Sequence, residues 1–282
     1  MKSHRRVRFE GPSTVRELIA SHELVRNLTL REIRSRYKRT ALGQGWSLLN
    51  PVAQITMYSI VFAYVLRVQI KPGASGLDVF ALWLSSALLP WLFFAAVVNS
   101  GVGALVGNAN LIKKVYFPRE TLIISALFSC LFSFLIELTV LHIAVVIFGG
   151  SIDPLHIAMT LLVTVLLSTF AIGVSLIMAV ANVYFRDTQH LVSLFLQAWF
   201  YLTPIMYPAT LIGTRVGGDS TVFKIYRLNP MERFSEAFRA TIYDSRFPTL
   251  ATLGYLLAFS VGTLVVGHLI FRRLEGRLAE EL

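Results

Sequence analysis

Residues 154–183 read PLHIAMTLLVTVLLSTFAIGVSLIMAVANV, thirty consecutive residues without an Asp, Glu, Lys or Arg. About 20 apolar residues in a helix are enough to cross the hydrocarbon core of a bilayer. Stretches of similar length and character recur along the chain. Together they predict six membrane-spanning helices over residues 46–66, 79–102, 120–148, 154–183, 188–206 and 248–270. We therefore expect an all-α integral membrane protein.

The composition also favours a membrane protein. The 282 residues are 55% hydrophobic and 15% charged, with a mean hydropathy of +0.64, which is more apolar than the core of a soluble domain can bury. The net charge of +10 would suit nucleic acid only if basic side chains covered a folded surface. Here they concentrate between the apolar stretches. Cys130 is the lone cysteine, so the chain forms no intrachain disulfide.

The distribution of basic residues predicts the orientation. Eleven of the 26 Lys and Arg residues precede Gly45, and positive charge is retained on the cytoplasmic side of the inner membrane. Six others lie in residues 205–247 on the opposite side, but longer loops follow this rule less strictly. We expect cytoplasmic N- and C-termini. The predicted organisation is a cytoplasmic region over 1–45, one transmembrane domain over 46–270 that includes the external segment 205–247, and a cytoplasmic tail over 271–282.

Residues 14–41 have the pattern of an amphipathic helix in two pieces, lying flat at the cytoplasmic surface. Thr14 with Glu17, and Thr29 with Glu32, have the spacing of capping boxes that begin helices. The second piece carries basic side chains for anionic lipid headgroups or an acidic partner. An equally good interpretation is a solvated basic face. The residues concerned are Arg31, Arg34, Arg36, Lys38 and Arg39.

A short cytoplasmic loop over residues 108–118 separates the second and third spans. Tyr116 and Phe117 follow Lys113 and Lys114 directly. Two protruding aromatic rings with a charged rim form a compact surface that fits a groove on another protein. The alternative is that both rings anchor the chain at the membrane interface.

A helix over residues 229–243 is predicted on the external side. Asn229 suits its N-cap and Pro230 its first turn, and apolar residues that include Phe234 and Phe238 recur at helical spacing. This helix is too short to span the membrane. It would rest on the outer leaflet or fold back as a re-entrant gate. The gate is favoured because prolines within residues 204–208 would end the fifth span just before it.

Recognisable catalytic motifs are absent from the sequence. It contains no G-x-x-x-x-G-K-[ST] phosphate loop and no H-E-x-x-H, paired Cys or Asp-x-Asp pattern. We expect neither enzymatic activity nor a metal site on this chain, and any nucleotide energy must come from a partner. Glu137 is the one carboxylate well inside a predicted span, where an ionisable group suggests function. A protonated side chain bonded to a neighbouring helix is the favoured, structural interpretation.

Several motifs in this order resemble the membrane subunits of ATP-binding-cassette exporters of the ABC-2 type for O-antigen, capsule and teichoic-acid-type polysaccharides. The resemblance covers nearly the whole chain, apart from its first two dozen residues and residues 213–220. The motifs are REIRSRYK at 31–38, LGQGW at 42–46, LNP at 49–51, NLIKKVYFPRE at 110–120, YFRD at 184–187, LTPIMYP at 202–208 and LNP at 228–230.

This resemblance implies a homodimer of six-span subunits that works with two cytoplasmic ATPase subunits. Those partners would bind ATP and magnesium, and the cargo would be a polyprenyl-linked glycan pushed outward. In the same way residues 108–118 would correspond to the family's coupling helix, residues 14–41 to its interface helix and residues 229–243 to its external gate helices. The sequence does not identify the glycan; O-antigen, capsule, teichoic acid and galactan all remain open.

A sliding glycan needs weak, repeated contacts, which aromatic faces supply. Three pairs have i,i+3 or i,i+4 spacing, so each pair shares a helix face. Packing against lipid, or a place in an interfacial aromatic belt, is the ordinary alternative for each ring. The candidate path residues are Tyr58 and Phe62, Trp91 and Phe94, and Phe195 and Trp199.

Three other functions compete with polysaccharide export. A channel or secondary transporter that needs no ATPase would carry more charge within its spans and matching broken helices. A membrane-embedded enzyme that processes glycans would need more acidic or basic groups at a cavity than Glu137 alone provides. An exporter of a drug or small lipid would differ only in path width and partner, so the sequence leaves it open.

Overall fold

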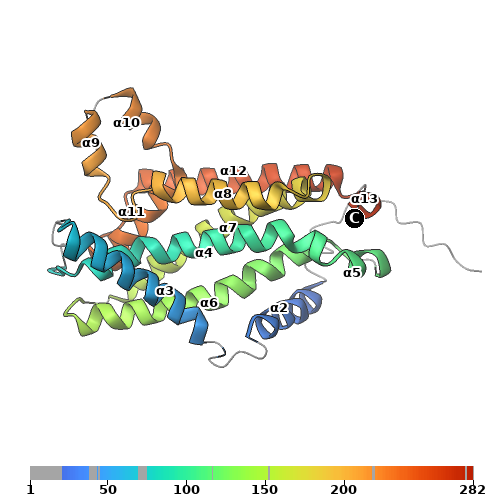
Figure 1. The fold of residues 1–282 in the computed structure, drawn as a ribbon, viewed down its shortest axis with the longest axis horizontal. Helices are drawn as coiled ribbons and strands as arrows, with labels where there is room; N and C mark the ends of the chain where they lie inside the picture. The colour runs from blue at the N-terminus through green and yellow to red at the C-terminus, as the bar shows by residue number, and fades with distance from the viewer. Residues whose placement is uncertain are drawn as a thin grey trace, which may run out of the picture.

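The computed structural model describes residues 21–37, 43, 45–68, 75–115, 117–151, 153–217, 220–276 and 278–281. Long helices lie side by side in a bundle (Figure 1), and these ranges contain no β-strand. The all-α prediction is therefore confirmed. The helices are α2 (His22–Tyr37), α3 (Gly45–Ser59), the π-helix η1 (Ile60–Val65), α4 (Phe80–Gly107), α5 (Ala109–Lys114), α6 (Glu120–Ile147), α7 (Pro154–Tyr184), α8 (Thr188–Leu202), α9 (Thr210–Val216), α10 (Thr221–Tyr226), α11 (Pro230–Ile242), α12 (Leu250–Leu274) and α13 (Leu278–Glu281).

Within the described residues, five helical segments are long and apolar enough to cross a membrane: Leu48–Val65, Phe80–Gly107, Glu120–Ile147, Pro154–Tyr184 and Leu250–Leu274. They match five of the six predicted spans, and the protein is an integral membrane protein with several spans. The predicted span 188–206 is shorter than expected, because α8 ends at Leu202 after 15 residues. At roughly 1.5 Å per residue this helix is about 22 Å long, less than the hydrocarbon core. Pro204 accounts for the early end, since the residue before a proline avoids helical geometry. The six-span count stays a prediction.

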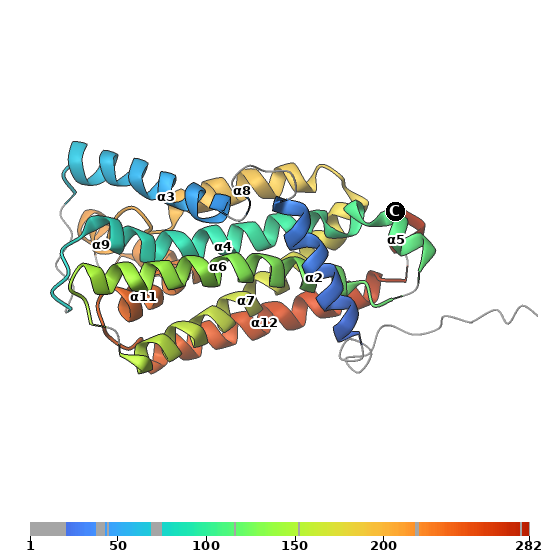
Figure 2. The ribbon, with the colours of Figure 1, turned by 90° about the horizontal axis from the view of Figure 1, so that it is seen from below.

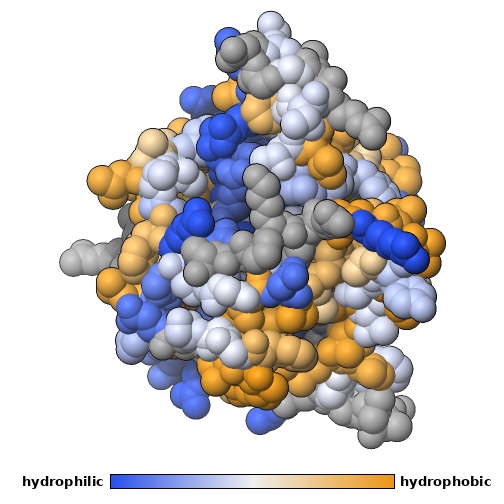
Figure 3. Space-filling model, turned by 90° about the vertical axis from the view of Figure 1, so that its left-hand side faces the viewer, coloured by the Kyte–Doolittle hydropathy of each residue, from blue (hydrophilic) through white to orange (hydrophobic). Residues whose placement is uncertain are grey.

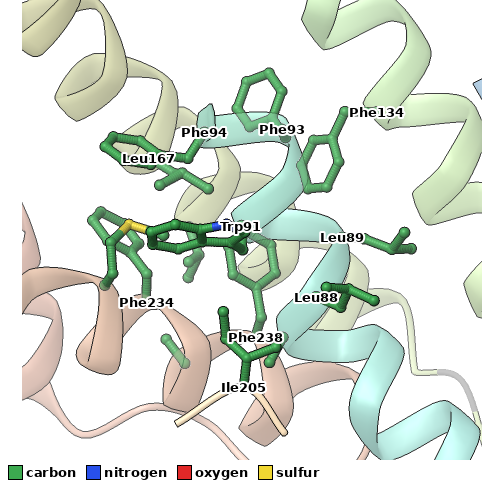
Figure 4. Packing of buried hydrophobic residues seen from close by; sticks show 14 of the residues in the cluster. Leu88, Leu89, Trp91, Phe93, Phe94, Phe134, Leu167, Ile205, Phe234 and Phe238 are labelled. Carbon is green, nitrogen blue, oxygen red and sulfur yellow. The ribbon is translucent and has the colours of Figure 1, made fainter. Parts of the chain in front are cut away.

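Helix α4 lies at the centre of the bundle. It packs against α3, α6, α7, α8 and α11, and its aromatic side chains point into several of these contacts (Figure 4). Phe93 stacks on Phe134 of α6 with ring centroids 4.5 Å apart, and Phe94 stacks on Phe170 of α7 at 5.3 Å. Rings on two consecutive residues of α4 therefore join it to two different helices.

Small residues set the closest helix contacts. A Cβ atom added to Gly267 of α12 would lie 2.4 Å from the carbonyl oxygen of Gly173 on α7. One added to Gly101 of α4 would lie 2.5 Å from Cβ of Ser175, also on α7. Small residues let helix backbones approach closely, which is a main source of helix association in membranes. Only glycine therefore leaves enough space for the helices to pack at both contacts.

The bundle has two distinct ends. One, here called the α5 end, holds α5, the start of α6, the end of α12 and α13 (Figures 1 and 2). The other, the α11 end, holds α9, α10, α11 and the start of α12. Successive long helices run in opposite directions between the ends. The chain therefore returns to the α5 end after α12.

Helix α2 lies across the bundle near the α5 end and packs on α6 (Figure 2). It is a single helix through Thr29, so the predicted second start at Thr29 is wrong. The hydroxyl of Thr29 donates to the carbonyl of Val25 at 2.8 Å instead of capping a new helix. The buried side chain of Leu28 joins α2 to the core, and burial there favours a continuous helix. The predicted cap at Thr14 lies outside the described residues.

Candidate functional site

An aromatic cluster forms where α4 meets α8. The Trp91 and Trp199 rings meet edge to face with centroids 5.9 Å apart, and Phe94 contacts Trp199 in the same way at 5.5 Å. Phe200 lies 5.7 Å from Trp91. Edge-to-face rings gain electrostatic energy beyond their burial. The structure therefore brings together two aromatic pairs that were predicted separately from helical spacing.

The members of this cluster differ in exposure. Trp91 and Phe94 are buried in the core, whereas Trp199 is half-buried. Phe195, one turn before Trp199 on α8, contacts its ring at 5.4 Å and is 61% exposed. The cluster thus extends from the core to the outer surface of α8. Within one chain Phe195 and Trp199 offer ring surface, and Trp91 and Phe94 support them from behind.

The pair predicted on the first span sits at the edge of the same cluster. Tyr58 of α3 lies 6.1 Å from Phe200, and Phe62 of η1 packs partly buried against the core. Their use as a substrate path stays a prediction. Phe200 itself was missed by the sequence reasoning, although its place next to Trp199 puts a ring on the inner face of α8.

Asn229 connects this cluster to α11. Its Oδ1 accepts a hydrogen bond from the backbone N–H of Met231 at 3.0 Å and another from Nε1 of Trp199 at 2.9 Å. Its Nδ2 donates to Oγ1 of Thr203 at 3.3 Å. The predicted N-cap at Asn229 is confirmed. The same side chain also ties the end of α8 to the start of α11, a link that sequence spacing alone does not show.

Helix α11 is embedded among α4, α7 and α12. It begins with Pro230, as predicted, and Phe234 and Phe238 are fully buried. Figure 4 shows both rings among the core side chains near Trp91 and Ile205. A surface-lying helix would expose one face, so the packing favours the re-entrant arrangement. Gating by this helix stays a prediction.

Charged residues of α11 are unusually enclosed. Glu232 is buried with Nε of Arg233 at 3.4 Å and Nε of Arg227 at 3.9 Å. Burial raises the pKa of Glu232 to about 7, and the nearby Glu236 adds to the rise while the arginines oppose it. Burial therefore favours the protonated form of Glu232 at the α11 end of the bundle.

The predicted loop over residues 108–118 contains the short helix α5. Lys113 and Lys114 are exposed at its end. Phe117 is buried at 8% exposure within an apolar cluster that also includes Leu122 and Val183, so the prediction that it protrudes is wrong. Burying an aromatic ring against neighbouring helices gains more than leaving it in water. Tyr116 lies outside the described residues.

The loop after α5 is joined to the end of α12. Glu120 places its Oε1 2.8 Å from Nδ1 of His268, and the Arg119 guanidinium donates to the backbone carbonyl of Glu275. Adjacent residues thus make two polar contacts to one distant segment. Sequence reasoning missed both contacts, because nothing in the local pattern relates residue 120 to residue 268.

Two of the basic residues predicted to meet lipid headgroups can be placed. Arg31 and Arg34 are exposed on α2, and Nη2 of Arg31 donates to Oδ1 of Asn108 at 2.7 Å. Arg31 therefore reaches the N-cap of α5. The Arg36 side chain and the whole of Lys38 and Arg39 lie outside the described parts.

Glu137 lies in the middle of α6 and is half-buried. Its side chain makes no hydrogen bond or ion pair with another residue in the described ranges. His142, five positions later, bonds its own helix at the carbonyl of Leu138, 2.7 Å away. The two side chains are therefore not a pair, and the role of Glu137 stays a prediction.

Comparison with known proteins decides the family. The ABC-2 type transporter family model matches residues 23–243, which is most of the chain and includes every helix from α3 to α11. The chain belongs to the ABC-2 type transporter family. This membership agrees with the motif resemblance and with the helical membrane fold.

Members similar to the chain include an O-antigen export system permease protein, RfbA, of Myxococcus xanthus, which is 31% identical over 95% of this chain and 98% of the relative. An RfbA of Klebsiella pneumoniae is 29% identical over 90% and 93%. The polysialic acid transport protein KpsM of Escherichia coli is 26% identical over 89% and 93%. These ABC-2 relatives align almost end to end with the chain.

Proposed function

We propose that this chain is the transmembrane subunit of an ATP-driven exporter that moves a polyprenyl-linked polysaccharide across the inner membrane. It works as a homodimer with two copies of a cytoplasmic ABC ATPase, which bind ATP and magnesium. The α5 end faces the cytoplasm, together with both chain termini, and the α11 end faces outward. The observation that carries this proposal is the nearly full-length similarity to O-antigen export permease proteins and to a polysialic acid transport protein.

The sequence chemistry agrees with energy supplied by a partner. The chain has no Gly-Lys dipeptide and hence no phosphate loop. ATP hydrolysis therefore has to occur on a separate chain. A transporter without an ATPase would need ionisable groups along the path to couple an ion gradient, and Glu137 alone does not form such a relay.

The α5 end has the features of a coupling element. Lys113 and Lys114 are exposed on α5 and available to an acidic groove of the ATPase. Arg119 and Glu120 join the following residues to α12. A displacement of α5 by the partner would therefore be passed to α12, which packs along α7.

The aromatic cluster and α11 have the features of a path and its outer gate. Phe195 and Trp199 offer ring surface on α8 for sugars that slide. Asn229 links Trp199 to the first turn of α11. Glycan at these rings would thus be sensed directly by the helix at the outer end.

The proposal is tested by affinity purification of the tagged chain from its native membrane, followed by an ATPase assay. We expect an ABC ATPase to co-purify. Changing Lys113 and Lys114 together to Ala is expected to release the ATPase or to abolish its stimulation by the membrane subunit. Lys224→Ala, an exposed lysine of α10 at the opposite end, is the matched control and should have no effect. Purification of the unaltered chain without any ATPase would contradict the proposal.

A further inference from the structure

A cavity lies at the α11 end of the bundle, lined by residues that are not part of the aromatic cluster or of the α5 end. It has a volume of about 360 Å³, within the range of small-molecule sites. Figure 3 views this end and shows hydrophilic residues gathered below the protruding α9–α10 segment. The residues that give the cavity its chemistry are Trp83, Thr210, Glu236, Arg239, Asp244, Arg246, Thr249 and Thr252.

The cavity has a buried cationic wall. Arg239 is only 7% exposed, and its guanidinium lies 3.8 Å above the centre of the Trp83 ring. Nη2 donates to the carbonyl of Ile205 at 2.5 Å, while Nε has no partner within the described residues. Buried donors are normally satisfied. A buried guanidinium with an unpartnered Nε therefore forms part of the cavity wall.

The remaining polar walls carry both signs of charge. Glu236 lies 3.7 Å from Arg227. The Asp244 carboxylate also lines the cavity. Burial raises the pKa of Asp244, and Arg246 and Arg239 oppose the rise. Two carboxylates and two guanidinium groups balance one another, so the cavity favours an uncharged ligand over an ion.

This balance selects against the obvious ionic ligands. A phosphate would meet the carboxylates of Glu236 and Asp244 as well as the arginines. A divalent cation would meet Arg239 and Arg246, and like charges at close range are costly. A polyhydroxyl ligand avoids both problems, because each hydroxyl group can donate to a carboxylate and accept from a guanidinium. Trp83 and Phe247 are the aromatic residues of the lining.

We propose that this cavity binds a single uncharged sugar residue of the exported glycan at the outer end of the bundle. The inference rests on the proposed function, since that function supplies the sugar and places this end outside. The site lies on α11 and the start of α12, away from the aromatic cluster on α8. It holds the emerging chain weakly, which keeps it from sliding back while the next sugars pass.

The test uses the purified full-length chain in lipid nanodiscs without its ATPase. Saturation-transfer difference NMR is recorded with methyl glycosides of glucose, galactose, mannose, rhamnose and N-acetylglucosamine, and with phosphoethanolamine and inorganic phosphate. We expect transfer to at least one glycoside. Asp244→Asn removes a charged acceptor and should reduce that transfer about tenfold. Asp78→Asn, an exposed acid at the same end that does not line the cavity, should leave it unchanged.

Three outcomes would overturn the inference: no transfer to any glycoside, transfer that Asp244→Asn leaves unchanged, or transfer only to phosphoethanolamine or phosphate. The last would make the cavity a site for charged headgroups. Thermal unfolding of both variants shows whether a loss of signal reflects misfolding. The binding assay needs neither the ATPase nor transport. A negative binding result therefore does not contradict the proposed export function. A purification that recovers no ATPase likewise does not decide whether the cavity binds a sugar.

Discussion

Helices α4 and α3–η1 are both apolar enough to cross a membrane but differ sharply in what covers them. In the most apolar stretch of α4, 78% of the residues are buried within the chain, whereas in the stretch Leu48–Val65 only 6% are. Helix α8 resembles α3, because only four of its residues are buried. The bundle therefore has a packed side, formed by α4, α7 and α11 with α12 packed along α7, and an open side, formed by α3–η1 and α8.

Hydropathy therefore shows that a helix is excluded from water, but it does not show whether lipid, another helix or another subunit covers it. The packed side is held by interlocking rings and glycine contacts within one chain. The open side carries exposed apolar residues such as Met57 and Phe195. These side chains have to be shielded from water, either by lipid or by the second subunit of the proposed homodimer.

The largest expected effect is on the packed side. Gly267→Ala would place Cβ 2.4 Å from the Gly173 carbonyl, and because a backbone atom is in the way α7 and α12 must separate. We expect a loss on the order of 3 kcal/mol in stability, measured as a lower thermal unfolding temperature in nanodiscs. Gly262→Ala, on the same helix with no atom within 4 Å, is the matched control and should not destabilise. Equal losses would refute the close contact.

A smaller effect compares the two sides directly with the same substitution. Val97→Ala on α4 removes methyl groups from a buried site, whereas Val52→Ala on α3 removes them from a side chain that is 50% exposed. The buried change should cost on the order of 2 kcal/mol, and the exposed one well under half of that. Thermal unfolding of both variants in nanodiscs measures the difference. A larger loss for Val52→Ala would show that the α3 face is packed in the assembled protein.

Substitutions of Asn229 test how strongly its hydrogen bonds join the open side to the packed side. Asn229→Ala removes the cap of α11 and the bond from Trp199, so we expect a loss of about 2 kcal/mol. Asn229→Asp keeps both acceptor functions and loses only the weaker Nδ2 contacts, so it should retain most of the stability. Thermal unfolding and the fluorescence of Trp199 report the change. Identical behaviour of the two variants would contradict the role of Oδ1.

The smallest effect is a pH dependence on the packed side. The pKa of Glu232 rises from an ordinary 4.5 to about 7 through burial, so folding favours the protonated form. The stabilising contribution of protonation is complete below the unfolded pKa and disappears as the pH rises through 7. The thermal unfolding temperature should therefore fall between pH 5 and pH 8 by an amount that Glu232→Gln removes. An unchanged slope in that variant would contradict the assignment.

The sequence predicted the elements better than their contacts. Length and hydropathy located the long helices, because each needs only its own residues to satisfy its backbone in the membrane. The Asn229-Pro230 pattern likewise located the start of α11, since capping is local. Phe117 was misjudged because its burial depends on cluster residues from other helices. The break predicted at Thr29 failed because packing of Leu28 stabilises a continuous helix.

The candidate site shows the same limit. Helical spacing correctly placed Trp91 with Phe94 and Phe195 with Trp199, as the ring distances show. That the two pairs meet across α4 and α8 follows from the tertiary fold alone. The contact between Glu120 and His268 and the cavity around Arg239 are tertiary as well, because each joins segments that no local pattern relates.

The most direct test of the central claim is to delete the gene in its own cell and to measure surface polysaccharide together with polyprenyl-linked glycan in the inner membrane. We expect surface polysaccharide to disappear and linked glycan to accumulate inside. We also expect the intact gene to restore export, whereas a Lys113→Ala, Lys114→Ala variant should not. Unchanged surface polysaccharide with no accumulation would contradict the proposed export function.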